Sequence, residues 1–98
     1  MNAEVHTPFE RLGVGDSVTA DIVIWKVPIP LRGSAHRFKY RLALIADGIC
    51  VLRYDNEAGK GDHRHVGGRE FAYDFQDVEQ LQVDFWTEVD EWLSKNRR

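Results

Sequence analysis

Alternating apolar and polar residues predict β-strands in the first half of the chain. From Ser17 to Val27 the β-branched residues are dense, and apolar positions alternate with mixed ones, as in a half-buried strand. Two further stretches, 38–46 and 49–56, flank the dipeptide Asp47-Gly48. Asp-Gly favours a two-residue hairpin turn because both central residues adopt a positive φ. The pattern therefore predicts one strand over 17–27 and a hairpin over 38–56.

The two-residue turn also predicts which side chains of the hairpin share a face. Counting from the turn pairs Tyr40 with Asp55, and Arg41 with Tyr54 on the other face. Both faces are apolar near the turn and become polar and cationic away from it. We therefore expect function at the open end of the hairpin, where the chain continues into residues 57–69.

The rest of the chain predicts one helix and two irregular segments. Asp77 is a suitable N-cap, and one helical face then carries Val78, Leu81, Phe85, Val89 and Trp92, so a helix is expected over 77–95. Residues 1–16 are expected to be irregular because Pro8 and two glycines interrupt them. Four glycines and no period predict a loop over 57–69, before a short strand over 71–75.

These elements predict an α+β fold. The expected sheet is antiparallel, has three to four strands within residues 17–75, and carries one C-terminal helix packed on a face. Ninety-eight residues are too few to bury two cores, so 1–98 is expected to be a single domain.

Composition limits the cellular setting and the available cross-links. The longest uncharged apolar run, Leu42 to Ala46, is far shorter than the roughly 18 residues of a membrane span, and residues 1–10 lack a signal-peptide pattern. We expect a soluble cytoplasmic protein with no membrane partner. The lone Cys50 excludes an internal disulfide and a cysteine-rich zinc site.

Charge is segregated along the chain although the net charge is only -3. Residues 26–64 contain eight basic and four acidic residues, whereas residues 70–91 contain eight acidic residues and no basic one. A basic surface attracts polyanions such as nucleic acid, although charged residues also simply solvate a small protein.

The densest group of reactive side chains lies in the expected loop: Lys60, Asp62, His63, Arg64 and His65. One interpretation is metal-independent RNA cleavage without a cofactor, in which His63 and His65 act as base and acid while Lys60 and Arg64 stabilise the charge on phosphorus. A second is a metal site formed by the two histidines with Asp55 or Asp62. A third is a structural loop whose polar side chains bind neighbouring carbonyl groups.

RNA-binding residues are expected next to this group. Arg37, Lys39 and Arg41 alternate along one strand and predict a one-sided cationic row, with Tyr54 as a stacking surface and Asn56 beside it. The alternative is that Arg41 only stacks on Tyr54 to stabilise the sheet.

Several motifs resemble the TumE family of small prokaryotic toxin-antitoxin proteins. They are His-Arg-Phe-Lys-Tyr-Arg (36–41), Arg-Tyr-Asp-Asn-Glu (53–57), Gly-Lys-Gly-Asp-His-Arg-His (59–65) and Tyr-Asp-Phe (73–75). The resemblance covers about residues 17–93. It implies a toxin-like protein with a cognate antitoxin partner, and it carries no settled catalytic assignment to these positions.

The leading hypothesis is therefore a toxin-like ribonuclease that uses the His/Lys/Arg loop and binds RNA with the basic end of the hairpin. The alternative is a non-enzymatic module that binds nucleic acid or a partner protein with the same face. The sequence leaves open the RNA sequence preference, the oligomeric state and the role of residues 1–16.

Overall fold

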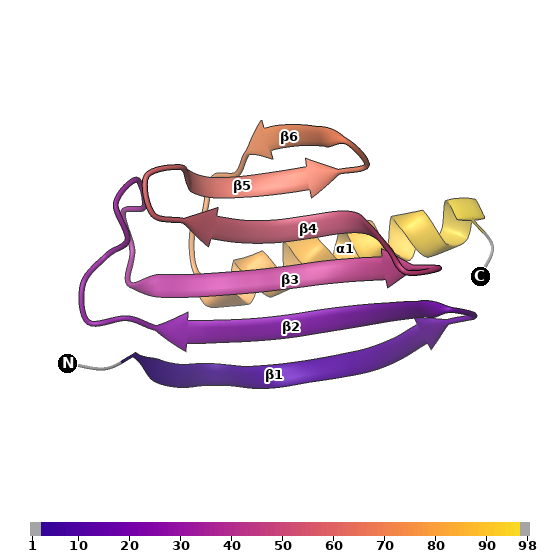
Figure 1. The fold of residues 1–98 in the computed structure, drawn as a ribbon, viewed down its shortest axis with the longest axis horizontal. Coiled ribbons are helices and arrows are strands. Elements are labelled where there is room, and N and C mark those ends of the chain that lie inside the picture. Colours follow the sequence, from indigo (N-terminus) through magenta and orange to yellow (C-terminus); the bar gives the residue numbers. More distant parts are fainter. Residues whose placement is uncertain (1–2, 97–98) are drawn as a thin grey trace.

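The computed structural model describes residues 3–96 as one six-stranded sheet and one helix (Figure 1). The strands are β1 (Glu4–Gly15), β2 (Val18–Lys26), β3 (Phe38–Ala46), β4 (Ile49–Glu57), β5 (Gly61–Val66) and β6 (Arg69–Ala72), and the helix is α1 (Val78–Asn96). Each strand pairs antiparallel with its neighbour in the chain, in the order β1-β2-β3-β4-β5-β6. The α+β class is confirmed, but the sheet has six strands and not three to four.

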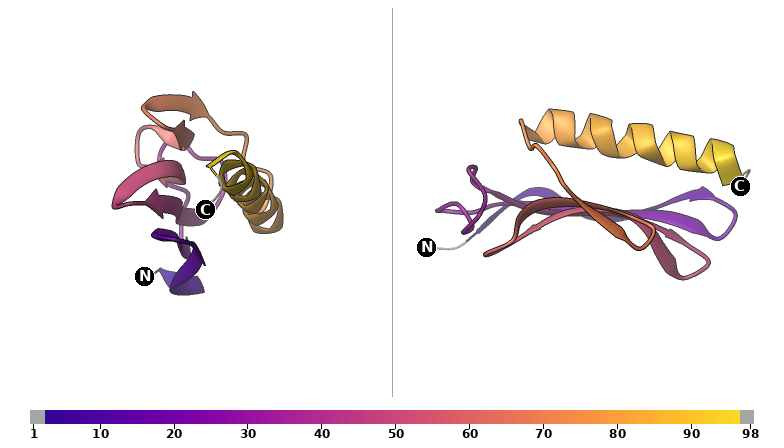
Figure 2. Two further views of the ribbon diagram at one scale, coloured as in Figure 1. Left: turned by 90° about the vertical axis from the view of Figure 1, so that its right-hand side faces the viewer. Right: turned by 90° about the horizontal axis from the view of Figure 1, so that it is seen from above.

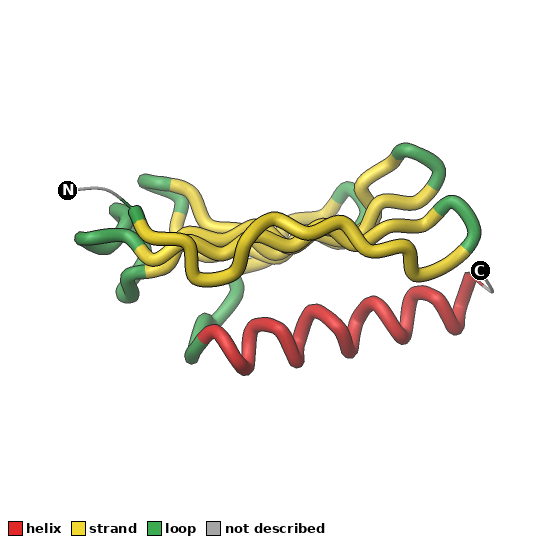
Figure 3. Tube along the Cα trace, turned by 90° about the horizontal axis from the view of Figure 1, so that it is seen from below, coloured by secondary structure: helices red, strands yellow, loops and turns green. Residues whose placement is uncertain are grey.

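The helix covers one face of the sheet and leaves the other without a covering layer (Figures 2 and 3). Between sheet and helix lies an apolar core that includes Ile24, Leu42, Leu44, Leu81 and Phe85, each no more than 5% exposed. We call the opposite side the open face. It is formed by alternate side chains of the strands, among them Trp25, Lys39, Arg41, Arg53, Asp55, His63, His65 and Glu70.

The first additional strand comes from the segment expected to be irregular. Residues 4–15 form β1, with shifts of register against β2 on both sides of Thr7 and between Gly13 and Gly15. Pro8 and the glycines are tolerated because β1 is an edge strand, whose second side needs no ladder of hydrogen bonds, and because bulges absorb extra residues. Residues 1 and 2 lie outside the described residues.

One more strand, β5, comes from the segment expected to be a loop, and β6 begins at its last residue, two residues before the short strand expected over 71–75. The glycines of 57–69 mark turns between strands: Gly59, Gly61 and Gly67 have positive φ, and β5 and β6 run between and after them. Gly61 also lies against Gly33, where an added Cβ would come within 2.7 Å of a backbone oxygen. The loop prediction is therefore wrong, because four glycines serve tight turns and one close backbone approach.

The β3–β4 hairpin confirms the turn but not the whole register. Asp47 and Gly48 have φ values of 52° and 78°, as the two-residue turn requires. Ile45 pairs with Cys50 as expected, but Leu44 pairs with Leu52, so that Val51 is an extra residue in β4. This β-bulge shifts every later pair by one residue.

Helix α1 has the cap and the buried face that its sequence indicates. Asp77 Oδ1 accepts a hydrogen bond of 2.6 Å from the backbone N–H of Gln80. Val78, Leu81, Phe85 and Val89 are buried against the sheet. Within residues 3–96, no helix has the length and apolar character to cross a membrane.

Candidate functional site

Strand β5 divides the residues expected to act in catalysis between the two sides of the sheet. His63 and His65 lie opposite Asp55 and Arg53 of β4, whereas Arg64 lies opposite Tyr54. Alternate side chains of a strand point to opposite faces. The structure therefore brings the two histidines together with Asp55 and Arg53 on the open face, and it separates them from Arg64.

The His63 ring lies between two hydrogen-bond acceptors. Its Nδ1 is 3.0 Å from the carbonyl oxygen of Gly61, and its Nε2 is 3.2 Å from Glu70 Oε1. The Gly61 oxygen accepts a hydrogen bond when Nδ1 carries a proton, and the contact with Glu70 is an ion pair when Nε2 carries one as well. The geometry thus fits an imidazolium ion, which is a proton donor.

His65 has the opposite requirement. Its Nε2 lies 3.1 Å from Nη2 of Arg53, and a guanidinium only donates, so this contact is a hydrogen bond when the nitrogen presents a lone pair. The same nitrogen is 3.6 Å from Asp55 Oδ1, which is beyond hydrogen-bond distance. The proton of the neutral ring is then on Nδ1, which lies 3.8 Å from Glu70 Oε2. His65 therefore fits a neutral base, and its ring centroid is 6.4 Å from that of His63.

Two carboxylates hold the cations of this group. Arg53 Nε is 3.2 Å from Asp55 Oδ2. This Nε is buried and forms an ion pair with Asp55 but no hydrogen bond. Lys60 Nζ is 3.6 Å from Glu70 Oε1. Glu70 contacts Lys60 and both histidines. The Arg53 side chain is 29% exposed, although its Nε is buried. We call Arg53, Asp55, Lys60, His63, His65 and Glu70 the histidine cluster.

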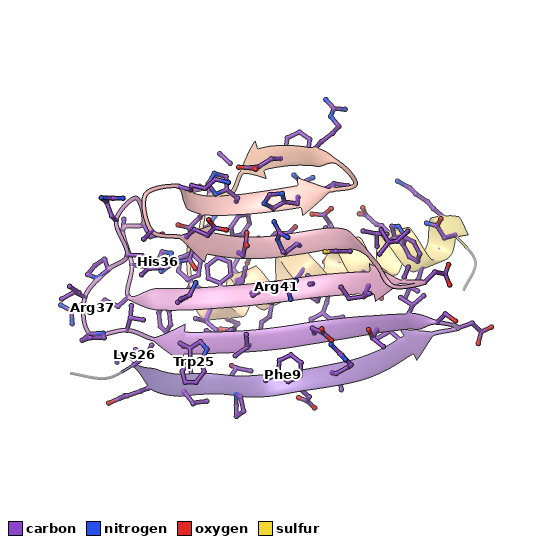
Figure 4. All side chains as sticks on the ribbon, viewed as in Figure 1. Phe9, Trp25, Lys26, His36, Arg37 and Arg41 are labelled. Carbon is purple, nitrogen blue, oxygen red and sulfur yellow. The ribbon has the colours of Figure 1, made fainter. Side chains whose placement is uncertain are left out.

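The cationic row expected on β3 is exposed beside the histidine cluster. Lys39 and Arg41 project from the open face, and Arg41 lies opposite Asp55. Lys39 Nζ also lies 3.4 Å from the backbone oxygen of Asn56. Arg37 is exposed in the segment before β3, at the end of the sheet (Figure 4).

Tyr54 and Arg64 face the helix. The Tyr54 hydroxyl donates to Glu88 Oε1, and Arg64 Nε donates to the same oxygen at 2.5 Å. Tyr54 is only 2% exposed, and its burial, followed by the hydrogen bond to Glu88, raises the pKa of its hydroxyl. Tyr54 therefore has no surface on which a base could stack. The expected pairing of Arg41 with Tyr54 is also wrong, because the bulge at Val51 places Arg41 opposite Asp55.

Asp62 is the acceptor of a second, buried group of polar side chains. Its Oδ1 accepts from the Ser34 hydroxyl at 2.6 Å, and its Oδ2 accepts from His36 Nε2 and the Tyr40 hydroxyl, each at 2.7 Å. His36 Nδ1 accepts from the backbone N–H of Phe38 at 3.1 Å, so Nε2 carries the proton. Burial, followed by the hydrogen bond to Asp62, raises the pKa of Tyr40.

Asn56 belongs to this buried group and not to the exposed cationic row. It is 1% exposed, its Oδ1 accepts from the Tyr40 N–H at 3.0 Å, and its Nδ2 donates to the Phe38 carbonyl at 2.7 Å. The regular β3–β4 pairing ends at Arg41 and Asp55. The Asn56 side chain thus supplies the hydrogen bonds that the partner strand no longer gives.

The metal interpretation finds no matching ligand set. Asp62 is occupied by three donors and does not join His63 and His65. Within the described part of the chain, no three His, Cys, Asp or Glu side chains form a group that could hold a metal ion.

Sequence reasoning missed Arg53 and Glu70 as members of the site. Both were counted only as charges, because Arg53 depends on the bulge and Glu70 on the pairing of β5 with β6. The signal for this last hairpin is the pair Gly67-Gly68, a dipeptide typical of a two-residue hairpin turn.

The geometry defines a small polar site on the open face of a helix-backed antiparallel sheet. A family model described as Toxin TumE matches residues 3–93, and the chain belongs to this toxin family. It is accordingly a toxin-like protein, and the family suggests a cognate antitoxin as its partner. No curated protein and no solved structure matches the chain.

Proposed function

We propose that this protein is a toxin that cleaves RNA at the histidine cluster. The observation that carries the proposal is the opposite hydrogen-bond requirement of two neighbouring histidines. His63 meets two acceptors and fits a proton donor, whereas His65 meets a donor and fits a proton acceptor. Cleavage of RNA by its own 2′-hydroxyl needs one group of each kind.

The proposed reaction is an in-line transesterification. His65 Nε2 accepts the proton of the 2′-hydroxyl while the 2′-oxygen forms a bond to phosphorus. The bond from phosphorus to the 5′-oxygen breaks, and this oxygen takes a proton from His63 Nε2. The products are a 2′,3′-cyclic phosphate and a 5′-hydroxyl, and proton exchange with water restores the two rings.

Cations next to the histidines stabilise the negative charge that gathers on the phosphoryl oxygens. Arg53 takes the place that the sequence hypothesis gave to Arg64, since Arg64 donates to Glu88 on the helix side. A phosphate drawn to the Arg53 guanidinium also frees His65 Nε2, which Arg53 contacts in the free protein. Lys60 reaches the cluster from the β4–β5 turn.

A hollow of about 350 Å³ adjoins the cluster at the Lys60 end. Its lining includes Lys60, His63, His36 and Phe75. It gives a substrate a way to the otherwise half-buried His63, whose side chain is 17% exposed.

The test is incubation of the purified protein with end-labelled single-stranded RNA in the presence of EDTA. We expect fragments with cyclic phosphate ends, and no cleavage when the RNA carries a 2′-deoxy residue at the cut. His63→Ala and His65→Ala should each slow cleavage about a hundred-fold or more. His6→Ala is the matched control, because His6 is an exposed histidine of β1 outside the cluster.

Two results would contradict this proposal. Cleavage that continues in the His63→Ala/His65→Ala double variant would remove the histidines from the chemistry. Folded protein that binds RNA in a salt-sensitive way but never cleaves it would instead support the non-enzymatic binding module.

A further inference from the structure

Two aromatic side chains lie exposed on the open face at a distance from the histidine cluster. Phe9 is 59% and Trp25 is 37% exposed, and both project from the same face as Arg41 (Figure 4). Val5, which pairs with Trp25, is 52% exposed. Large apolar side chains that cluster on the solvent-exposed surface of a protein usually mark a contact surface.

The aromatic pair continues directly into the cationic row. Trp25 lies opposite Lys39, and Val23 of the same strand lies opposite Arg41. Arg41 in turn lies opposite Asp55, which lies opposite His63. Three strand spacings separate β2 from β5, about 14 Å, so that an extended strand of a few nucleotides spans this path.

The charge around the aromatic pair favours a polyanion. Arg11 lies over the Phe9 ring, with its guanidinium carbon 5.8 Å from the centroid. On the open face of β1 and β2, Asp21 is 5% exposed and bound by Arg11 through two hydrogen bonds of 2.7 and 2.8 Å. The exposed Glu10, next to Phe9 in β1, lies opposite the buried Ile22, on the helix side of the sheet. Neighbouring Lys39 and Arg41 are exposed.

We infer that Phe9 and Trp25 form a stacking platform for the bases of single-stranded RNA, whose phosphates run over Lys39 and Arg41 toward the histidine cluster. The inference rests on the proposed function and adds its substrate class. Bases stack on aromatic side chains only when they are not already stacked within a duplex. The platform therefore selects single strands.

The binding test uses a fluorescently labelled single-stranded 2′-O-methyl RNA, which cannot react because it has no free 2′-hydroxyl. Phe9→Ala and Trp25→Ala should each weaken binding about ten-fold, the effect typical of losing one stacked base. Phe71→Ala is the matched control, since Phe71 is 37% exposed but lies opposite Arg64, on the helix side of the sheet. A duplex of the same sequence should bind more weakly than the single strand.

A second measurement observes the stacking itself. Replacing Trp86 and Trp92 by phenylalanine leaves Trp25 as the only tryptophan of the chain. Addition of the single-stranded probe should quench its fluorescence, and the duplex should not. Unchanged affinity in both alanine variants, equal binding of the duplex, or a Trp25 signal that responds to the cognate antitoxin but not to RNA would each overturn the platform.

The platform and the proposed function fail in different ways. Cleavage with a wild-type KM in Phe9→Ala and Trp25→Ala would overturn the platform and leave the ribonuclease intact. Trp25 quenching and weakened binding in the alanine variants, without cleavage of any RNA, would keep the platform and overturn the ribonuclease.

Discussion

Replacing Asn56 by alanine should destabilise the fold far more than a surface substitution does. The side chain is 1% exposed and serves two buried backbone groups, the Tyr40 N–H and the Phe38 carbonyl. A buried polar group left without a partner costs about 1–3 kcal/mol. With two such groups, the expected loss in the free energy of unfolding is about 2–6 kcal/mol, a large share of the roughly 5–15 kcal/mol typical of a folded protein.

Urea denaturation followed by circular dichroism measures this loss. Asn96→Ala is the matched control, because Asn96 is exposed at the end of α1 and donates to the Trp92 carbonyl of its own helix. That control should change the free energy of unfolding by no more than about 0.5 kcal/mol. A loss below about 1 kcal/mol for Asn56→Ala, with an unchanged denaturant slope, would refute the structural role. Weaker RNA binding with unchanged stability would restore Asn56 to the RNA-binding row.

Two further predictions concern the pH dependence of stability and the turns. The hydrogen bond from Arg11 holds the pKa of Asp21 below its usual range, so the stability from this pair is present above the ordinary Asp pKa of about 3.9 and disappears as the pH falls through the lower folded value. Urea midpoints of wild type and Arg11→Ala should accordingly differ at neutral pH and converge in acid; a constant difference would contradict the linkage. Gly48→Ala should lower the free energy of unfolding by about 1–2 kcal/mol, because Gly48 has a φ of 78°. Gly68 has open space for a Cβ, so Gly68→Ala should raise the free energy of unfolding by about 0.4–1 kcal/mol. Equal effects of the two substitutions in thermal denaturation would refute this contrast.

The features that the sequence predicted well depend on neighbours a few residues apart. Asp47-Gly48 forms the expected turn, Asp77 caps the helix, and the helical period identifies the face that packs on the sheet. Each of these depends on backbone conformation or on a repeat within one element. The α+β class follows from them.

The strands that the sequence missed depend on partners elsewhere in the chain. β1 contains a proline and shifts of register, and β5 has only six residues. Such strands are stable because an existing sheet offers hydrogen bonds to their backbone, which their own composition does not indicate. The polar alternation of His63, Arg64 and His65 lacked the apolar positions by which a strand is usually recognised.

The membership of the candidate site depends on one extra residue, Val51. Without the bulge, Arg53 and Asp55 would share a face with Leu42 and Leu44 and lie beneath α1, where desolvation costs several kcal/mol per ion. With the bulge, Leu52 and Tyr54 are buried instead, 3% and 2% exposed, and the charged pair faces outward.

The Val51 carbonyl accepts a hydrogen bond of 3.0 Å from the Gly67 N–H, one residue beyond the pair of Leu52 and Val66. The turn between β5 and β6 is thus bonded to the bulged residue, and β6 carries Glu70 to the two histidines. The apolar residues Leu52 and Tyr54, two apart in β4, already conflicted with a register counted from the turn alone. Burial of the stronger apolar face decides such a conflict, and it makes Arg53, rather than Arg64, the cation beside His65.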